Sequence, residues 1–427
     1  EKEYVHKRKQ IVLYQIISLL HIFIQDSVPH IALLASGGGQ RAAVGLVGSL
    51  HQMEKEGLLD TLLYLGGVSG STWSMASLYN DSQFSTNMDA AVSRLFDSPS
   101  VKLEQAVDWL GERAKEEHFS LADIWGVLTS AGIMKQMDLR CLSDEANRNA
   151  TNPYPIYCAI EKHCFTQGPI EGKWFEISPH EAGFTELGLF IETSLLGSKF
   201  QNGTLLEKKK EMDMVKLQVL SVLERKRQFL LYSIHVNVFL PVSFLINQVI
   251  PLIAEWKWGT TGNFLYRYQG ESDNLSNNYD PFPLNESLLT QNHESSVPAC
   301  LYSNERLQLI DAGLVINVPY PSFLGDKRDI DLIIAPEYSA GNMFEVLPRG
   351  KIFPFPEIND TILEDRDWPK DCYVLEGKEK EPTIIYMPLF NRRNCKGLFP
   401  NSNTLNIHKK THFQHLYSAR LLSSNIF

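Results

Sequence analysis

The chain repeats one local pattern twice in succession, and this repeat constrains its fold more than any other feature. An apolar run at His30–Ala35 is followed by glycines and by helical spacing over Arg41–Glu56, which ends at Gly57. A second run, Leu62–Leu65, is followed by a glycine pair and a helix predicted from Ser69 onward. Strand, tight glycine turn and helix in succession indicate a parallel sheet covered by helices. The sequence therefore predicts an α/β fold with a central, mostly parallel sheet flanked by helices.

The second glycine turn is a candidate nucleophile elbow. The segment Gly67-Val68-Ser69-Gly70-Ser71 lies between a predicted strand and a predicted helix. In this context a sharp turn presents a serine hydroxyl above the sheet. The segment departs from the G-x-S-x-G pattern at its last position, where Ser71 replaces glycine. Ser69 is the candidate nucleophile, and the alternative is that it only caps the following helix.

The first glycine turn offers the donors that ester hydrolysis needs. Backbone N–H groups placed around the developing oxyanion contribute about 3 kcal/mol each. Gly37, Gly38 and Gly39 follow a strand and precede a helix, so their amides can point outward with the helix dipole behind them. Arg41 follows closely and is a candidate for binding a phosphate or for damping charge in the transition state. Its alternative interpretation is an ordinary surface arginine.

The same glycines also satisfy a dinucleotide-binding pattern. A G-x-G-x-x-A sequence begins at Gly37, and Glu54, Glu56 or Asp60 lies near the expected acidic position. This alternative leaves unexplained why a second glycine turn bearing a serine follows the next strand. A hydrolase needs both turns side by side, so we favour the hydrolase.

A carboxylate is the best candidate for the base that Ser69 requires. None of the twelve histidines has an obvious strand-end setting, whereas Asp311 directly follows the apolar run Leu307–Ile310 and precedes Ala-Gly. Desolvation would raise the basicity of this carboxylate toward that needed to accept a hydroxyl proton. The alternative is an Asx turn at a strand end. Asp331–Ala335 and Ile384–Leu389 are predicted to be further strands of the sheet.

Two long segments stand apart from the predicted core. Phe229–Ala254 has no Asp, Glu, Lys or Arg and is long enough for a membrane span, but polar residues and Pro241 interrupt it. A lid or interfacial helix and a buried helix pair broken at Pro241 both remain possible. We assign 205–256 to a candidate lid or membrane-contact segment. We assign 271–298, rich in Asn, Ser, Asp and Glu, to a flexible surface loop.

Net charge and cysteine spacing bear on whether the protein binds nucleic acid and whether its cysteines are reduced. The formal net charge of -10 argues against a protein held to nucleic acid by bulk positive charge. The six cysteines show neither zinc-type spacing nor a disulfide framework, so reduced thiols are expected.

The helical period over Lys7–Gln25 predicts an amphipathic helix within residues 1–28 and not a signal peptide, because no small-residue cleavage site follows. Without an export signal, we expect the Asn-x-Ser/Thr sequons to be unmodified. The sequons begin at Asn149, Asn202, Asn274, Asn285 and Asn359.

Taken together, these motifs resemble those of the cytosolic phospholipase A2 group IV family, closest to its gamma type. The three principal motifs are SGGGQRA at 36–42, GVSGSTW at 67–73 and DAGL at 311–314. Between the second and third motifs lie further segments that resemble the family's catalytic domain in the right order, at 153–156, 174–179, 197–200 and 256–261. The resemblance spans roughly residues 5–420 and is weak over 207–255.

The resemblance implies a patatin-like catalytic domain over 1–427 with a dyad of Ser69 and Asp311. Gly38 and Gly39 match the family's oxyanion glycines, and Arg41 matches an arginine needed for activity. No metal or cofactor is expected, and calcium should be dispensable, because the gamma type lacks the family's calcium-dependent lipid-targeting domain. Gamma members end in a prenylated cysteine motif, from which this sequence departs.

The resemblance further implies phospholipid and lysophospholipid substrates, acyl transfer between them, peripheral contact with intracellular membranes and a cytoplasmic location. Three functions compete at this point. They are a phospholipase A2 with lysophospholipase and transacylase activity, a general carboxylesterase on the same core, and a non-catalytic lipid-surface module. No nucleic-acid partner is expected.

Overall fold

The computed structural model describes residues 1–21, 28–97, 99, 101–115, 119, 121–167, 173–218, 259–268, 297–339, 354–365 and 368–394. The chain forms two compact units, neither of which is continuous in sequence. The first comprises Glu1–Ser98, Arg148–Ile156 and Ile316–Phe427, and the second comprises Pro99–Asn147 and Tyr157–Val315. Strand β3, Tyr154–Glu161, contributes its first three residues to the first unit and the remainder to the second.

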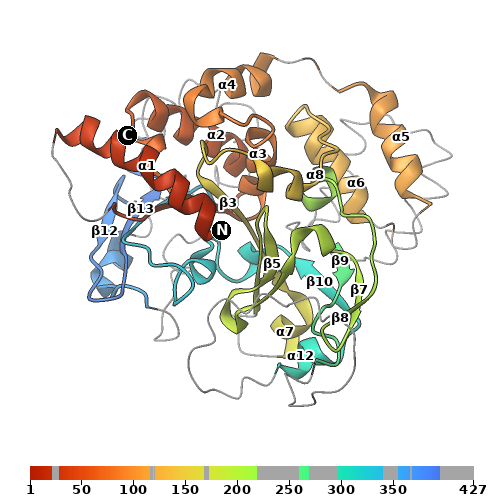
Figure 1. The fold of residues 1–427 in the computed structure, drawn as a ribbon. Coiled ribbons are helices and arrows are strands. Elements are labelled where there is room, and N and C mark those ends of the chain that lie inside the picture. The colour runs from red at the N-terminus through yellow and green to blue at the C-terminus, as the bar shows by residue number, and fades with distance from the viewer. Residues whose placement is uncertain are drawn as a thin grey trace. The chain divides into compact units, whose positions relative to one another are not determined.

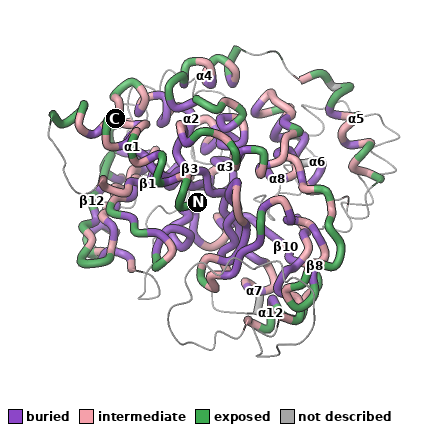
Figure 2. Tube along the Cα trace, viewed as in Figure 1, coloured by how far each residue is buried: buried purple, intermediate pink, exposed green. Residues whose placement is uncertain are grey.

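The first unit is built around a predominantly parallel sheet. Its strands lie in the order β12-β13-β11-β1-β2, and only β12 runs antiparallel to its neighbour. All five residues of β1 are buried, as expected for a central strand covered on both faces (Figure 2). The elements of this unit, apart from β3 and short 3-10 turns, are α1 (Lys2–Leu20), β1 (Ile31–Ala35), α2 (Gln40–Lys55), β2 (Tyr64–Gly67), α3 (Gly70–Leu78), α4 (Met88–Asp97), β11 (Leu332–Glu337), β12 (Tyr373–Leu375) and β13 (Thr383–Pro388) (Figure 1). The predicted α/β class and parallel sheet are confirmed.

Local sequence explains the helices that flank this sheet. Helix α2 begins directly after the glycine turn and ends before Gly57, whose φ of 71° is unfavourable for other residues. It packs against both α3 and α4. Helix α1 buries Val5, Val12 and Ile16 at helical spacing, together with Arg8, whose guanidinium donates to the Leu62 carbonyl oxygen at 3.1 Å. The helix thus turns these side chains into the first unit, while residues 22–25 of the predicted range Lys7–Gln25 lie outside the described residues.

The paired strands of the sheet in the second unit run antiparallel to one another. β3 pairs with β4, β4 with β5 and β5 with β6, while β10 pairs with both β3 and β9. Apart from β3, its elements include α5 (Leu103–Arg113), α6 (Leu121–Val127), α7 (Lys162–Gln167), β4 (Lys173–Ile177), β5 (Glu181–Phe184), β6 (Leu189–Glu192), β7 (Lys199–Gln201), β8 (Thr204–Glu207), α8 (Met214–Leu217), β9 (Gly259–Gly262), α12 (Ala299–Tyr302) and β10 (Arg306–Ile310). The run predicted at Leu307–Ile310 is thus a strand, but an antiparallel one.

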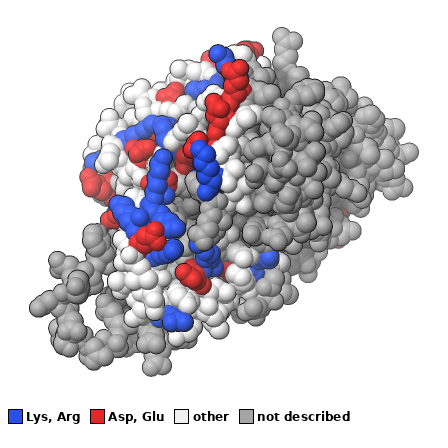
Figure 3. Space-filling view, turned by 90° about the vertical axis from the view of Figure 1, so that its right-hand side faces the viewer, with Lys and Arg blue, Asp and Glu red and all other residues white. Residues whose placement is uncertain are grey.

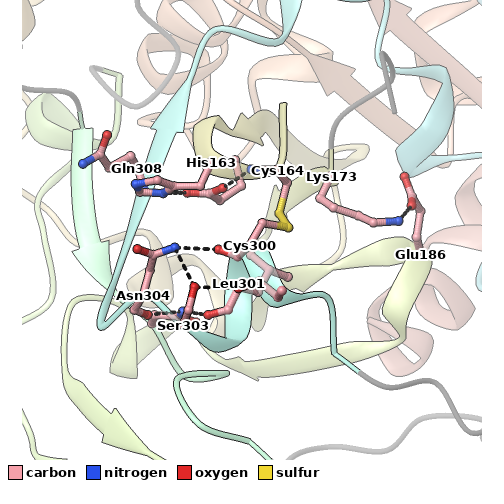
Figure 4. Close-up of a disulfide and its surroundings, with 12 residues drawn as sticks. His163, Cys164, Lys173, Glu186, Cys300, Leu301, Ser303, Asn304 and Gln308 are labelled. Atoms are coloured by element: carbon pink, nitrogen blue, oxygen red, sulfur yellow. Dashed lines mark hydrogen bonds and ion pairs between the residues drawn. A yellow bond between two sulfur atoms is a disulfide. The ribbon is translucent and has the colours of Figure 1, made fainter. Parts of the chain in front are cut away.

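A disulfide joins two helices of the second unit. Cys164 of α7 is bonded to Cys300 of α12, with the two Cα atoms 5.1 Å apart (Figure 4). The expectation that all cysteines are reduced was therefore wrong for this pair. The partners are separated by 136 positions, so no local spacing could reveal a pairing that only the fold creates.

Several predicted segments lie outside the described residues. These include the uncharged stretch 229–254, most of the candidate lid 205–256 and nearly all of the loop 271–298. Within the described residues, no helix combines the length and the apolar character needed to cross a bilayer. On the face shown in Figure 3, lysine and arginine side chains lie interspersed with aspartate and glutamate side chains.

Candidate active site

Ser69 lies in the strained turn expected of a nucleophile. Its backbone has φ 52° and ψ −128°, a region that residues with a side chain rarely occupy. It connects the end of β2 to the first residue of α3, and only 3% of its surface is exposed. The side chain makes no capping hydrogen bond to α3, although Ser69 occupies the N-cap position. The geometry therefore matches a nucleophile elbow better than a helix cap.

Ser71 explains why the elbow departs from the usual glycine pattern. Its hydroxyl donates to the carbonyl oxygen of Ser36 at 2.6 Å. Ser36 is the last residue before the first glycine turn, so this bond ties the two turns together. A glycine at position 71 would leave this buried carbonyl oxygen without that donor.

The first glycine turn lies against the elbow. A Cβ atom built on Gly37 would come within 2.9 Å of Ser69 Cβ, and one built on Gly70 would come within 1.9 Å of the Gly39 carbonyl oxygen. Neither position has room for a side chain. The two turns predicted from separate strand ends are therefore brought into direct contact within the first unit.

The three glycines of the first turn differ in what their amides do. The Gly37 N–H donates to the Asn317 carbonyl oxygen at 2.9 Å. No hydrogen bond within the described residues takes the N–H of Gly38 or Gly39. Gly39, with φ 62° and ψ −134°, immediately precedes α2, so both amides lie at a helix N-terminus. The structure thus leaves two backbone donors available, at the positions that the resemblance assigns to the oxyanion hole.

Arg41 is a half-buried cation without a carboxylate partner. It lies in the first turn of α2, and its guanidinium carbon is 5.9 Å from the centre of the Phe390 ring. Its buried Nε has no hydrogen-bond partner, and no acidic group among the described residues lies within ion-pair distance. Burial lowers the pKa of the Arg41 guanidinium, and the charge of Glu337 acts in the opposite direction. Arg41 is therefore not an ordinary surface arginine.

A buried amide and a buried carboxylate beside the glycine turn were not identified from the sequence. Asn317 Nδ2 donates to the Gly37 carbonyl oxygen at 3.0 Å and to Glu337 Oε1 at 2.8 Å. Glu337 is fully buried, and Oε1 also accepts from the Ser339 N–H at 2.9 Å. Burial raises the pKa of the Glu337 carboxyl, and hydrogen bonds from Ser339 and Asn317 act in the opposite direction. A polar residue at the carboxyl end of a predicted parallel strand was the available signal for Glu337.

Asp311 follows strand β10 as predicted, but in the second unit. Only 1% of its surface is exposed, and Oδ1 accepts from the Gly313 N–H at 2.8 Å. This bond is an Asx turn, so that interpretation correctly describes one of its carboxylate oxygens. Ser69 belongs to the first unit, and its pairing with Asp311 stays a prediction. Within either unit, the described histidine, cysteine and acidic residues form no three-ligand metal cluster.

Comparison with known proteins identifies the family of this chain. Residues 31–351 match the model of the lysophospholipase catalytic domain family. Cytosolic phospholipase A2 gamma of Homo sapiens is 27% identical, and the alignment covers 93% of this chain and 85% of that protein. Cytosolic phospholipase A2 zeta of Homo sapiens is 29% identical over 92% of this chain, which spans 52% of that relative.

A solved structure extends the agreement to the fold. Human GIVD cytosolic phospholipase A2 matches with a TM-score of 0.69 at 26% identity. The match covers 91% of this chain and 55% of that one.

Proposed function

This chain belongs to the lysophospholipase catalytic domain family and is a carboxylic ester hydrolase, and we propose that it is a calcium-independent phospholipase A2 and lysophospholipase acting through Ser69 and Asp311. The observation that carries the proposal is the strained backbone of Ser69 directly against the glycine turn whose Gly38 and Gly39 amides remain available. A serine hydroxyl and preset backbone donors are what acyl transfer requires.

The proposed reaction has two acyl-transfer steps. Asp311 accepts the Ser69 hydroxyl proton while Oγ forms a bond to the acyl carbonyl carbon, and the N–H groups of Gly38 and Gly39 donate to the resulting oxyanion. The carbon–oxygen bond to the glycerol breaks, and the alkoxide takes the proton from Asp311. Water then attacks the acyl-serine ester in the same way, which releases the fatty acid and restores Ser69. If a lysophospholipid hydroxyl replaces water, the same step transfers the acyl group.

Asp311 is proposed as the base because of its burial and its position in the chain. It is almost fully buried, a setting in which desolvation favours accepting a proton. It also precedes Asn317 by only six positions, and Asn317 contacts Gly37 through both its backbone and its side chain. This short connection supports a role beside the glycine turn.

Arg41 is proposed to bind the phosphate of the phospholipid head group. Its guanidinium has no carboxylate partner within ion-pair distance among the described residues. A half-buried arginine that forms no ion pair keeps its N–H donors available for a phosphate oxygen. The distant charge of Glu337 and the Phe390 ring compensate part of the cost of its burial.

We place the protein in the cytoplasm, in peripheral contact with membranes, because its relatives are named cytosolic phospholipases. The Cys164–Cys300 disulfide argues the other way, since disulfides are rare in reducing compartments. Asn149, Asn202 and Asn359 begin sequons and are exposed. A cytoplasmic protein should show no mobility change with peptide N-glycosidase, whereas a shift would place it in the secretory pathway.

The decisive experiment is product analysis on a phospholipid with differently labelled acyl chains, with and without a calcium chelator. We expect release of fatty acid in both conditions and no release by Ser69→Ala or Asp311→Ala. Matched controls are Ser85→Ala, another buried serine, and Asp213→Ala, which removes a carboxylate that caps α8 much as Asp311 caps its own turn. Near-normal turnover by either site variant would refute the assignment.

The same assay separates the alternative functions. Equal rates on short monomeric esters and on vesicles would indicate a general carboxylesterase. Vesicle binding without fatty acid release by the wild type would indicate a non-catalytic lipid-surface module. Appearance of a diacyl product from lysophospholipid alone would demonstrate acyl transfer.

A further inference from the structure

Asn317 contacts Gly37 through its backbone oxygen and through both polar atoms of its side chain. Its backbone oxygen accepts from the Gly37 N–H, and its Nδ2 donates to the Gly37 carbonyl oxygen. Its Oδ1 lies 2.4 Å from the position that a Cβ atom of residue 37 would occupy. Both polar groups of the Gly37 backbone are therefore bound to Asn317, and Gly37 itself has no amide left for a substrate.

This arrangement fixes the direction of the next amide. The carbonyl group of Gly37 and the N–H group of Gly38 belong to one planar trans peptide, so they point in opposite directions. Asn317 Nδ2 at 3.0 Å and Ser36 Oγ at 2.9 Å both donate to the Gly37 carbonyl oxygen. Two donors that hold the carbonyl on one side necessarily hold the Gly38 N–H on the other.

Glu337 holds the Asn317 side chain in this orientation. An amide nitrogen has two hydrogens, and those of Asn317 are used by the Gly37 carbonyl oxygen and by Glu337 Oε1. Glu337 Oε1 is anchored in turn by the Ser339 N–H. Within the Asn317 amide, Glu337 accepts from Nδ2 and not from Oδ1. Glu337 therefore sets which end of the Asn317 amide faces Gly37.

We infer that Asn317, oriented by Glu337, is a positioning residue that aims the Gly38 N–H at the oxyanion. This inference rests on the proposed function and extends it from the donors to the groups that hold them. Asn317 touches neither the ester nor Ser69 Oγ in this scheme. It acts by preventing rotation of the Gly37–Gly38 peptide, and a preset donor is worth more than one that must reorient during the reaction.

The test compares Asn317→Ala with Asn152→Ala. Asn152 is also a buried asparagine of the first unit, and its side chain likewise bonds two backbone groups, the Asp81 carbonyl oxygen and the Ser85 N–H. The active fraction of each variant is counted by complete labelling with a fluorophosphonate, and kcat is calculated per labelled site. Incompletely folded protein is thereby excluded from the comparison.

We expect Asn317→Ala to lower kcat per site by about 100-fold and to leave KM nearly unchanged, because the oxyanion exists only in the transition state. A trifluoromethyl ketone, which forms an oxyanion on Ser69, should lose affinity by a similar factor. Asn152→Ala should lower thermal stability and leave both quantities unchanged. An Asn317→Ala variant with wild-type kcat per site and wild-type ketone affinity would overturn the inference.

A double-mutant cycle tests the role of Glu337. If Glu337 acts through Asn317, Glu337→Ala should lower kcat in the wild-type background and have no further effect in the Asn317→Ala background. Glu337→Gln keeps an oxygen acceptor and should lose less activity than Glu337→Ala. Additive effects would overturn the role of Glu337. Failure of the wild type to label at Ser69 would instead overturn the proposed function.

Discussion

A methyl group at position 70 would come within 1.9 Å of the Gly39 carbonyl oxygen. The backbones of the glycine turn and of the nucleophile elbow are therefore in direct contact at Gly39 and Gly70. We expect Gly70→Ala to separate the two turns, to lower kcat by at least 10-fold and to reduce the free energy of unfolding by about 2 kcal/mol. Steady-state hydrolysis and urea denaturation measure the two effects.

Gly111→Ala is the matched control for this substitution. Gly111 lies within α5, and a Cβ atom there would meet nothing within 4 Å. Alanine should stabilise this helix by about 0.5–1 kcal/mol and leave hydrolysis unchanged. If Gly70→Ala behaves like Gly111→Ala, the close contact has no functional importance.

The backbone conformation at position 69 should make the folded protein less stable with serine there than with glycine. Its φ of 52° with ψ −128° favours glycine, so Ser69→Gly should unfold at higher denaturant concentration than Ser69→Ala. We expect a difference of about 1 kcal/mol, with both variants inactive. Equal stabilities would show that the turn stores no strain at this residue.

Arg41→Ala should affect phospholipids more than esters without a phosphate. The guanidinium has no carboxylate partner within ion-pair distance in the described part of the chain, so its loss removes a phosphate ligand without breaking an internal ion pair. We expect kcat/KM on phospholipid to fall at least 10-fold further than on a neutral monoester. Arg94→Ala, which removes a guanidinium bonded to the Ser77 carbonyl oxygen, is the control. Equal losses on both substrates would indicate that Arg41 supports the oxyanion instead.

Glu337 should make the stability of the protein depend on pH. Burial raises the pKa of this carboxyl above its ordinary value of 4.5. From that value up to the raised pKa the folded state binds more protons than the unfolded state, so stability falls as pH rises. Glu337→Gln cannot titrate, and its stability relative to wild type should increase from about pH 4.5 toward neutrality. Urea denaturation across this range measures the difference, and parallel curves would contradict the prediction.

Lys208, Lys209 and Lys210 follow hairpin β7–β8 and should contribute to binding of anionic membranes. No ion pair within the described residues involves any of them, and the neighbouring Leu206 is 62% exposed. Replacing all three with glutamine should weaken binding to phosphatidylserine vesicles by about 100-fold, at roughly 1 kcal/mol per lysine. Hydrolysis of a monomeric ester should not change.

The control for these lysines is a second set with the same charge change, namely Lys370, Lys378 and Lys380 in the first unit. Vesicle sedimentation at low and high salt compares the two triple variants. An equal loss of binding by both would attribute the effect to net charge and not to the hairpin.

The sequence predicted those features that depend on neighbouring residues. Strand, glycine turn and helix follow one another closely around Gly37 and Ser69, so their elements and their contact at one sheet edge could be anticipated. The run before Asp311 was recognised as a strand, but a short apolar run contains no information on direction. Its antiparallel pairing depends on β3 and β9, which are distant in sequence.

The role of Asn317 could not be predicted for a related reason. Asparagine is common in turns, and nothing in its local sequence distinguishes it. Its inferred role depends on contact with Gly37, which is 280 positions away, and with Glu337 at the end of β11. Such contacts exist only once the sheet has assembled.

The Cys164–Cys300 bond has a practical consequence for mapping the candidate lid. It encloses the whole uncharged stretch 229–254 in one covalent ring. A protease that cuts this ring once leaves a single species on a non-reducing gel and two fragments after reduction. Stretch 229–254 can thus be cut while the two fragments stay covalently attached, and hydrolysis by the nicked protein tests whether the stretch acts as the proposed lid.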